Sequence, residues 1–219
     1  MIEIKAILDE DFVNYHKCSM FIGFPKCSFK CGKGLCQNSA LATAESKQIS
    51  AEDLVNRYLS NPLSEAIVIG GLEPFDTYEQ LKELVTAFRK KTFDDIVIYT
   101  GYEPEEIIEE IQGIWHFPNM YFKFGRYIPE KPSRFDKILG VTLASDNQYG
   151  YCSEAGATVT INPDKEHIKK IRAALQKKNG YCPCSLIQSE DTLCPCKEFR
   201  EREEDGFCHC QLYKKEHLR

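Results

Sequence analysis

The chain has 219 residues, of which 42% are hydrophobic, and a formal net charge of −5 at pH 7. This size can bury a real core, so we expect one domain of ordinary size with a small second module, and the interspersed charges exclude the basic face that nucleic-acid binding needs. No apolar run is long enough to span a membrane, and residues 1–10 alternate apolar and charged residues, so we expect a cytoplasmic protein with no signal peptide and no membrane partner.

Short apolar runs along the first part of the chain predict the strands of a sheet. The first run alternates apolar and charged residues, and the later runs are continuous, as expected of strands that are buried on both faces. The predicted strands are residues 2–8, 18–24, 66–69, 96–99 and 120–124.

Amphipathic helices are predicted between these strands. Ser50 with Asp53 forms a capping-box-like start for the first helix, and Asp76 caps the second. A third helix is expected to begin at Pro104 and to end at Gly113. Repeated strand and helix units imply a parallel sheet covered by helices, but there are too few units to close an eight-stranded barrel. We therefore expect an α/β fold with an open, partial barrel.

Three loops follow directly after predicted strand ends, where ligands collect in parallel sheets. The first loop holds Cys27, Cys31 and Cys36, and the next two are residues 70–74 (Gly-Gly-Leu-Glu-Pro) and residues 100–102 (Thr-Gly-Tyr). We expect all three loops to share one rim of the sheet and one site.

The three closely spaced cysteines indicate a metal cluster. Three thiols are one short of the four that a four-iron cluster normally takes from protein, so either another residue completes the site or one iron is open to chemistry. A zinc site that lacks its fourth ligand and three unrelated cysteines are the alternatives. Without an export signal the thiols are expected to stay reduced, which favours metal or redox chemistry over a disulfide scaffold. Cys18 and Cys152 stand apart and are expected to be small buried hydrophobes.

Residues 150–160 are small and polar, as expected of a connection between modules. This connection places one predicted domain at residues 1–150 and a second at residues 151–219. Asn162 then caps a predicted helix that Gly180 ends.

Three Cys-x-Cys pairs follow that helix. One four-iron cluster uses four of their six thiols and leaves two, which is enough for a redox-active disulfide beside the cluster. A zinc knuckle is the alternative, but one zinc site would leave two cysteines idle and two sites would want eight ligands. The pairs are Cys182 with Cys184, Cys194 with Cys196, and Cys208 with Cys210.

The cysteine loop and the segment 70–74 together resemble those of radical S-adenosylmethionine enzymes. Segments 100–102 and 125–129 look like those of the activating proteins of anaerobic ribonucleoside-triphosphate reductases, and the resemblance covers about residues 15–150. Three features depart from the family pattern. The chain has four residues, not the usual two, between the second and third cysteines, and Leu35 precedes the third cysteine where the family usually has an aromatic residue. The glycine segment also carries an inserted leucine, Leu72.

This resemblance implies a partial, open β/α barrel of the radical S-adenosylmethionine type with two bound groups. One is a [4Fe-4S] cluster held by Cys27, Cys31 and Cys36, and the other is S-adenosylmethionine, chelated by the open iron. The residues implied to contact this cosubstrate are Gly70, Gly71, Glu73 and Tyr102. Packing is the alternative role for Tyr102.

The implied activity is reductive cleavage of S-adenosylmethionine to methionine and a 5'-deoxyadenosyl radical, which then abstracts hydrogen from the target. The implied target is a glycine in the large subunit of an anaerobic ribonucleotide reductase or in another glycyl radical protein. The implied electron donor is a ferredoxin or a flavodoxin.

Residues 151–219 are similar to the catalytic chain of ferredoxin-thioredoxin reductase, including the helix before the first cysteine pair and the two residues after the last pair. The similarity implies a small, mainly helical iron-sulfur domain with a second [4Fe-4S] cluster. The implied cluster ligands are Cys182, Cys194, Cys196 and Cys208. Cys184 and Cys210 would then form the disulfide, with His209 moving protons beside it and a thioredoxin or glutaredoxin as the partner. An ordinary surface histidine is the alternative for His209.

Three interpretations of the whole chain follow. The first is a radical activating enzyme with an attached thiol-redox module. The second is a ferredoxin-dependent thioredoxin or glutaredoxin disulfide reductase whose N-terminal domain is non-catalytic or conducts electrons. The third is a zinc-binding scaffold without catalysis.

Overall fold

The computed structural model describes residues 1–115, 117–152, 157–202 and 204–217, which form two compact units. The first unit contains Met1–Ala87 and the described residues from 94 to 152. The second contains Phe88–Phe93 and the described residues from 157 onward. None of the described helices is both long and apolar enough to cross a membrane.

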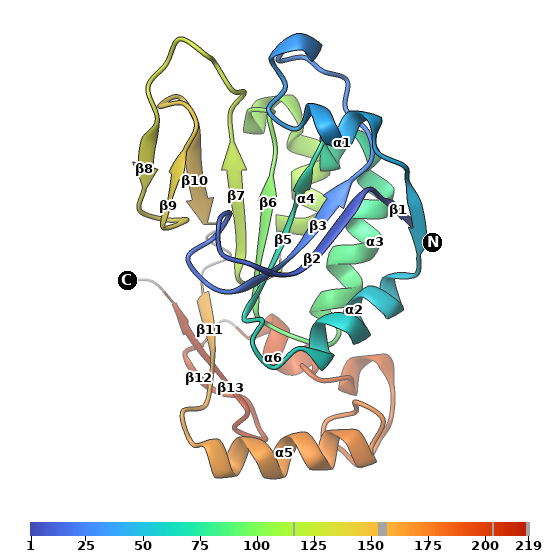
Figure 1. The fold of residues 1–219 in the computed structure, drawn as a ribbon. Coiled ribbons are helices and arrows are strands. Elements are labelled where there is room, and N and C mark those ends of the chain that lie inside the picture. The colour runs from blue at the N-terminus through green and yellow to red at the C-terminus, as the bar shows by residue number, and fades with distance from the viewer. Residues whose placement is uncertain (116, 153–156, 203, 218–219) are drawn as a thin grey trace. The chain divides into compact units, whose positions relative to one another are not determined.

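The first unit is built on a six-stranded sheet with the strand order β10-β7-β6-β5-β3-β2 (Figure 1). The four central strands run parallel, and the two outer strands are antiparallel to their neighbours. The four predicted continuous apolar runs are confirmed as the parallel strands, and nearly all of their residues are buried, including the charged Lys123 of β7. The strands are β2 (Ala6–Asp11), β3 (Ser19–Phe24), β5 (Ala66–Gly71), β6 (Asp95–Tyr99), β7 (Met120–Phe124) and β10 (Tyr149–Cys152).

Three helices connect the parallel strands and cover one face of the sheet (Figure 1). They are α2 (Ala51–Ser60), α3 (Tyr78–Arg89) and α4 (Ile108–Trp115). The predicted start of α2 is confirmed, because the Ser50 hydroxyl accepts a hydrogen bond from the Asp53 N–H at 3.0 Å.

The predicted cap of α3 is wrong. Asp76 lies in the 3-10 turn η2 (Pro74–Thr77) that precedes the helix, and its carboxylate accepts hydrogen bonds from Ser28 and Tyr102 instead. Glu73 caps this turn by accepting a hydrogen bond from the backbone of the turn. Asp76 therefore binds partners that are distant in the sequence and does not cap the helix.

The predicted end of the third helix is also wrong. A 3-10 turn, η3 (Pro104–Glu106), comes first, and Gly113 lies inside α4, which continues to Trp115. An added Cβ atom at Gly113 would lie 1.9 Å from the Tyr78 hydroxyl. Close packing against α3, not helix termination, explains this glycine.

The predicted strand at residues 2–8 is split in two. Its first part, β1 (Ile2–Ile4), pairs with β4 (Lys47–Ile49), whereas the second part belongs to β2 and pairs with β3. One alternating run therefore serves two sheets, which the pattern alone does not reveal. The remaining elements of this unit are η1 (Lys33–Leu35), α1 (Ser39–Thr43), β8 (Arg134–Asp136) and β9 (Val141–Leu143).

The second unit combines helices with a three-stranded antiparallel sheet in the order β11-β13-β12. The expectation of a mainly helical domain missed this sheet, because β11 and β13 pair across a long stretch of chain that no local pattern signals. Residues 153–156 of the predicted connection lie outside the described residues. The elements are β11 (Ala157–Ile161), α5 (Lys165–Lys177), η4 (Glu190–Thr192), α6 (Lys197–Glu201), β12 (Gly206–Phe207) and β13 (Tyr213–His217).

Helix α5 does not use its predicted cap. Asp164, not Asn162, accepts hydrogen bonds at 3.0 Å from two N–H groups of the first turn. The predicted end is confirmed, since Gly180 has a φ of +86° and its N–H bonds to the Leu175 carbonyl at 2.8 Å.

Gly71 ends β5 at a point where this strand approaches β3 closely. Its φ is +88°, and an added Cβ atom would lie 2.8 Å from the Cα atom of Gly23. Both the backbone conformation and the contact demand glycine. A glycine of the predicted cosubstrate loop therefore has a structural reason of its own.

We expect Gly71→Ala to destabilise the first unit by about 2 kcal/mol or more, because the new Cβ atom meets backbone and alanine disfavours a positive φ. Gly34→Ala is the matched control, since its Cβ atom would meet nothing within 4 Å. Urea unfolding followed by the fluorescence of Trp115, the single tryptophan, measures both variants. Equal free energies of unfolding for the two variants would contradict the prediction.

Candidate metal centres

One cavity of about 340 Å³ in the first unit brings the three predicted loops together. Cys27, Cys31 and Cys36 all line this cavity. The two other loops contribute Gly71, Leu72, Glu73, Thr100 and Gly101. Gly70 and Tyr102 are not among the lining residues. The loops meet at one rim as expected, while the cofactor-binding roles of the single residues stay predictions.

The cysteine loop keeps its first thiol half-buried. The Cys27 sulfur accepts a hydrogen bond from the Phe29 N–H at 3.2 Å. Burial raises the pKa of Cys27 to about 11; the Phe29 hydrogen bond lowers it, and the nearby carboxylates of Glu73 and Asp76 raise it. A free thiol here keeps its proton at neutral pH, so a bound metal cluster has to displace that proton.

Glu73 ties the loop after β5 to the loop after β6. Its carboxylate accepts hydrogen bonds from the Thr100 hydroxyl at 2.8 Å, the Gly101 N–H at 2.8 Å and the Phe75 N–H at 3.2 Å. Glu73 is only 6% exposed, and this burial raises its pKa to about 7 although the three hydrogen bonds lower it. A carboxylate has about four acceptor positions, so one remains for a ligand in the cavity.

Tyr102 holds the cysteine loop in place. Its hydroxyl donates a hydrogen bond to an Asp76 carboxylate oxygen at 2.6 Å and lies 3.1 Å from the Ser28 hydroxyl. The Ser28 N–H donates to the other Asp76 oxygen, and the Lys30 ammonium lies 4.4 Å from the centre of the Tyr102 ring. These contacts give Tyr102 a positioning role, while its contact with a cosubstrate stays a prediction.

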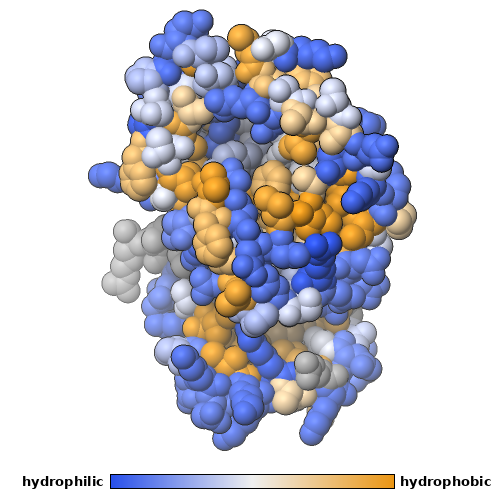
Figure 2. All heavy atoms as spheres, viewed as in Figure 1, coloured by the Kyte–Doolittle hydropathy of each residue, from blue (hydrophilic) through white to orange (hydrophobic). Residues whose placement is uncertain are grey.

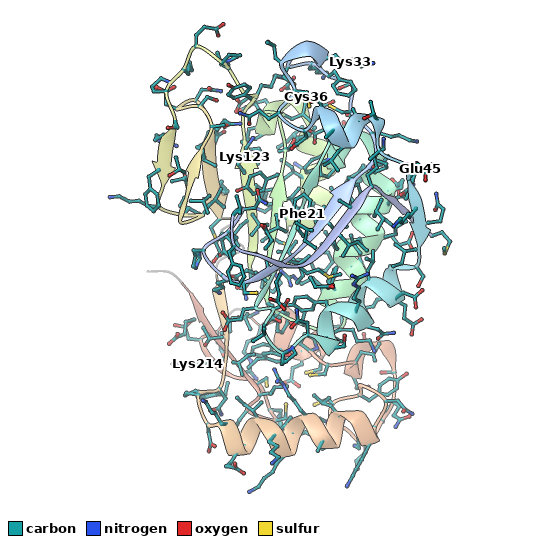
Figure 3. All side chains as sticks on the ribbon, in the orientation of Figure 1. Phe21, Lys33, Cys36, Glu45, Lys123 and Lys214 are labelled. Atoms are coloured by element: carbon teal, nitrogen blue, oxygen red, sulfur yellow. The ribbon has the colours of Figure 1, made fainter. Side chains whose placement is uncertain are left out.

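Lys123 is a cavity residue that sequence reasoning missed. It lies among the strands of the sheet (Figure 3), and its ammonium donates hydrogen bonds to the carbonyls of Gly125 at 2.9 Å and Thr100 at 3.2 Å. Burial lowers its pKa to about 8, while the charges of Glu73, Glu103 and Cys31 raise it. An ammonium has three donors, so one is left for a ligand. The available signal was a lysine inside an otherwise apolar predicted strand.

The cysteines of the second unit differ in burial, from fully buried to exposed. Four of them belong to the hydrophobic core around Phe199 and Tyr213. These four are Cys182, Cys194, Cys208 and Cys210. Cys196 is half-buried and Cys184 is exposed, and both line a hollow with the exposed His209.

The buried thiols influence one another strongly. The sulfurs of Cys208 and Cys210 are 3.5 Å apart, and the hydrogen bond between them lowers the pKa of Cys208 and raises that of Cys210. Burial raises the pKa of Cys194 to about 12, and the neighbouring Cys182 thiol adds to this. Thiolates this close repel one another unless metal ions share their charge. Cys184 and Cys210 are both free thiols, so their pairing stays a prediction.

Cysteine thiols are the donors that four-iron clusters take from protein. Among the described residues, no three His, Cys, Asp or Glu side chains are placed so that they could hold one metal ion. A four-iron cluster is larger than one ion, so its thiol ligands stand further apart than those of a tetrahedral zinc site. Both cysteine groups therefore fit a cluster in the chemistry of their donors.

His167 is a second residue that sequence reasoning missed. It lies on α5, and its Nε2 atom is 2.9 Å from the Cys210 carbonyl oxygen. Because a carbonyl oxygen only accepts, Nε2 carries the hydrogen in this contact. His167 thereby fixes the backbone of the last cysteine pair. The available signal was a histidine in the helix that precedes the cysteine pairs.

Cys18 and Cys152 are both half-buried. They are less buried than expected of small hydrophobes, because each lies beside polar groups, and their purely structural role stays a prediction. The charges of Glu10, Glu65 and Asp11 surround Cys18, and Cys152 hydrogen-bonds with the Tyr121 side chain.

Comparison with protein families agrees with these two cysteine groups. Residues 16–134 match the family described as a 4Fe-4S single cluster domain, and since this is more than half of the chain, the protein belongs to that family. Residues 136–218 match the family described as the ferredoxin thioredoxin reductase catalytic beta chain. No curated protein matches the chain. The two matches define an iron-sulfur redox protein, so the predicted [4Fe-4S] cofactor is confirmed and the zinc-scaffold interpretation is set aside.

The raised pKa of Glu73 predicts a pH-dependent stability of the cluster-free first unit. The pKa is about 7 in the folded unit against an ordinary value of 4.5, so the folded state binds the proton more tightly and its stability falls as the pH rises from 5 to 8. At about 1.4 kcal/mol per pKa unit, this loss amounts to about 3 kcal/mol.

We expect Glu73→Gln to remove most of this loss, and Glu45→Gln, at an exposed carboxylate, to leave it unchanged. Urea unfolding at several pH values, followed by Trp115 fluorescence, measures the loss. A Glu73→Gln variant with the same pH slope as the wild type would refute the assignment.

Proposed function

We propose that this iron-sulfur redox protein is a radical S-adenosylmethionine activating enzyme with an attached thiol reductase module. The observation that carries the proposal is that Cys27, Cys31 and Cys36 line one cavity together with Glu73. Three thiols fit a [4Fe-4S] cluster that keeps one iron for an outside ligand. When bound, this cluster supplies the electron for reductive cleavage of S-adenosylmethionine.

The remaining hydrogen-bonding capacity of the cavity fits the amino acid part of that cosubstrate. Glu73 has one acceptor position left, which suits an ammonium group, and Lys123 has one donor left, which suits a carboxylate. Both side chains are buried, so their contacts with a charged ligand are strong. The two residues together would orient a zwitterionic α-amino acid group.

Apolar side chains complete the cavity wall and limit the access of water. Phe21, Leu35, Tyr99 and Leu143 line the cavity beside the polar groups, and Phe21 lies on the sheet face shown in Figure 3. Exclusion of water protects a reactive organic radical from side reactions. This lining supports a radical reaction at the cavity more than simple electron transfer.

The proposed target is a glycine in the large subunit of an anaerobic ribonucleotide reductase or in another glycyl radical protein. Resemblance of the loop segments supports this target. The surface offers further support, because the exposed Phe12 and Val13 stand next to the cavity and Val13 lines it. On the face in Figure 2, hydrophobic side chains gather over the first unit, as expected of a surface that binds another protein.

The second candidate function is a ferredoxin-dependent thioredoxin or glutaredoxin disulfide reductase. The match of residues 136–218 favours it. In this function the exposed Cys184 would meet the partner protein, and the buried Cys210 would be its disulfide partner. His209, exposed at the same hollow, would supply or accept the protons of disulfide reduction. Both functions draw on a ferredoxin or flavodoxin donor.

Crossed cysteine variants separate the two functions. Protein prepared without oxygen should hold about eight irons per chain if both cysteine groups bind clusters, and Cys31→Ala should lose about half of them. We expect 5'-deoxyadenosine formation to be absent in Cys31→Ala and retained in Cys184→Ser. Reduction of thioredoxin should show the opposite pattern.

Chemical analysis of iron and sulfide and chromatography of the nucleoside products provide the measurements. Cys18→Ser is the control, because Cys18 lines neither the cavity nor the hollow of the second unit. Wild-type protein that holds both clusters and yet forms no 5'-deoxyadenosine after chemical reduction would rule out the radical function.

Lys123→Met tests the carboxylate site within the proposed cavity. We expect S-adenosylmethionine to bind about tenfold or more weakly, since a hydrogen bond from a charged donor is worth about 1.5–3 kcal/mol. Decarboxylated S-adenosylmethionine, which lacks the group that Lys123 would bind, should lose little affinity. Equilibrium dialysis without oxygen gives both constants. Equal losses for the two ligands would show that Lys123 only supports the loops.

A further inference from the structure

The cysteine loop borders a second hollow besides the cavity. The hollow is lined by the outer side of the loop, including Lys26, Cys27, Phe29, Lys33 and Asp76. Cys27 lines both the cavity and this hollow. A cluster bound to the Cys27 sulfur would therefore be accessible from both the cavity and the hollow. Glu73 and Lys123, which are proposed to bind the cosubstrate, line only the cavity.

Two lysines give the hollow a positive rim. Lys26 and Lys33 are exposed, and neither forms an ion pair with any described residue. Lys33 lies on the outside of the loop (Figure 3), with its ammonium 5.8 Å from the centre of the Phe29 ring. Asp76 also lines the hollow, but both of its carboxylate oxygens already accept hydrogen bonds from neighbouring groups. Lys26 and Lys33 outnumber the single carboxylate of Asp76, so the lining of the hollow keeps a net positive charge, although the chain as a whole carries −5.

We propose that this hollow is the docking surface for an acidic protein that carries one electron at a time. The proposal rests on the proposed function, in which the cluster held by the three cysteines of this loop has to be reduced. In the transfer step the donor protein loses one electron and the cluster gains it, and no covalent bond forms or breaks. A docked donor reaches the Cys27 side of the cluster while the cavity stays filled by the cosubstrate.

Electrostatic attraction explains why an acidic donor protein would bind at this hollow. A protein of net negative charge repels an acidic partner at long range, so a local positive rim decides where the two surfaces meet. Contacts of this kind raise the rate of association and lose strength as salt screens them. Phe29 also lines the hollow and adds an apolar contact, which fits the mixed character of transient interfaces.

The test uses oxidised flavodoxin, an acidic one-electron carrier that contains no iron and so leaves the iron count of the protein unchanged, and the cluster is assayed in its absence. The variant is Lys26→Glu with Lys33→Glu in the full chain, prepared without oxygen. The matched control is Lys47→Glu with Lys137→Glu, which changes the net charge equally at two exposed lysines that line neither hollow nor cavity. Titration calorimetry measures flavodoxin binding at low and high salt, and absorbance during dithionite treatment reports the intact cluster.

We expect the Lys26 and Lys33 variant to bind flavodoxin about tenfold or more weakly at low salt, with the difference vanishing at high salt. The control pair should change the affinity much less, and dithionite should reduce the cluster equally in all proteins. Equal weakening by the control pair, unchanged affinity in the variant, or absence of binding by the wild type would each overturn the docking proposal. Salt-sensitive binding through Lys26 and Lys33, without 5'-deoxyadenosine formation after dithionite, would keep the docking surface and overturn the radical function.

Discussion

The cavity of the first unit depends on one constraint: the ends of neighbouring parallel strands have to stay fixed at one edge of the sheet. Glu73 supplies part of this constraint by accepting hydrogen bonds from Thr100 and Gly101, which joins the loop after β5 to the loop after β6. Lys123, at the end of β7, supplies the matching part by donating to the carbonyls of Thr100 and Gly125. A buried anion and a buried cation thus cross-link three strand ends through the backbone. Each charge keeps one hydrogen-bonding position for a ligand, so the same residues that fix the rim also give it binding capacity.

The parts of this site that depend on repeated patterns were predictable from the sequence. Continuous apolar runs indicated the parallel strands, and the rule that ligands collect at their carboxyl ends predicted that the cysteine loop and the Glu73 loop meet. Residues whose partners lie far along the chain were not predictable in this way. The hydrogen bonds of Lys123 go to backbone carbonyls, which leave no trace in a side-chain pattern. Asp76 matched a local cap although its partners are Ser28 and Tyr102. The pairing of β11 with β13 was missed for the same reason.

The two cysteine groups lie in different environments, and each environment suits a different kind of reaction. The three thiols of the first unit are half-buried around a cavity that also presents charged and apolar walls, as a site that admits a small molecule needs. Most thiols of the second unit are part of a hydrophobic core that includes Phe199 and Tyr213, and only Cys184 reaches the surface fully. A cluster in such a core, with one accessible thiol beside it, would suit electron transfer to a protein partner.

Burial of so many thiols would also couple the folding of the second unit to any cluster that it binds. Burial raises the pKa of Cys194 to about 12, so without metal this thiol is protonated at neutral pH and acts as a small apolar side chain. Iron binds the thiolate form, which means that cluster binding has to remove protons inside the core and to compensate the charges that appear there. The free energy of cluster binding is then part of the free energy of folding of this unit. A cluster held this way would be lost only together with the packing around Phe199, whereas the Cys184 thiol is exposed.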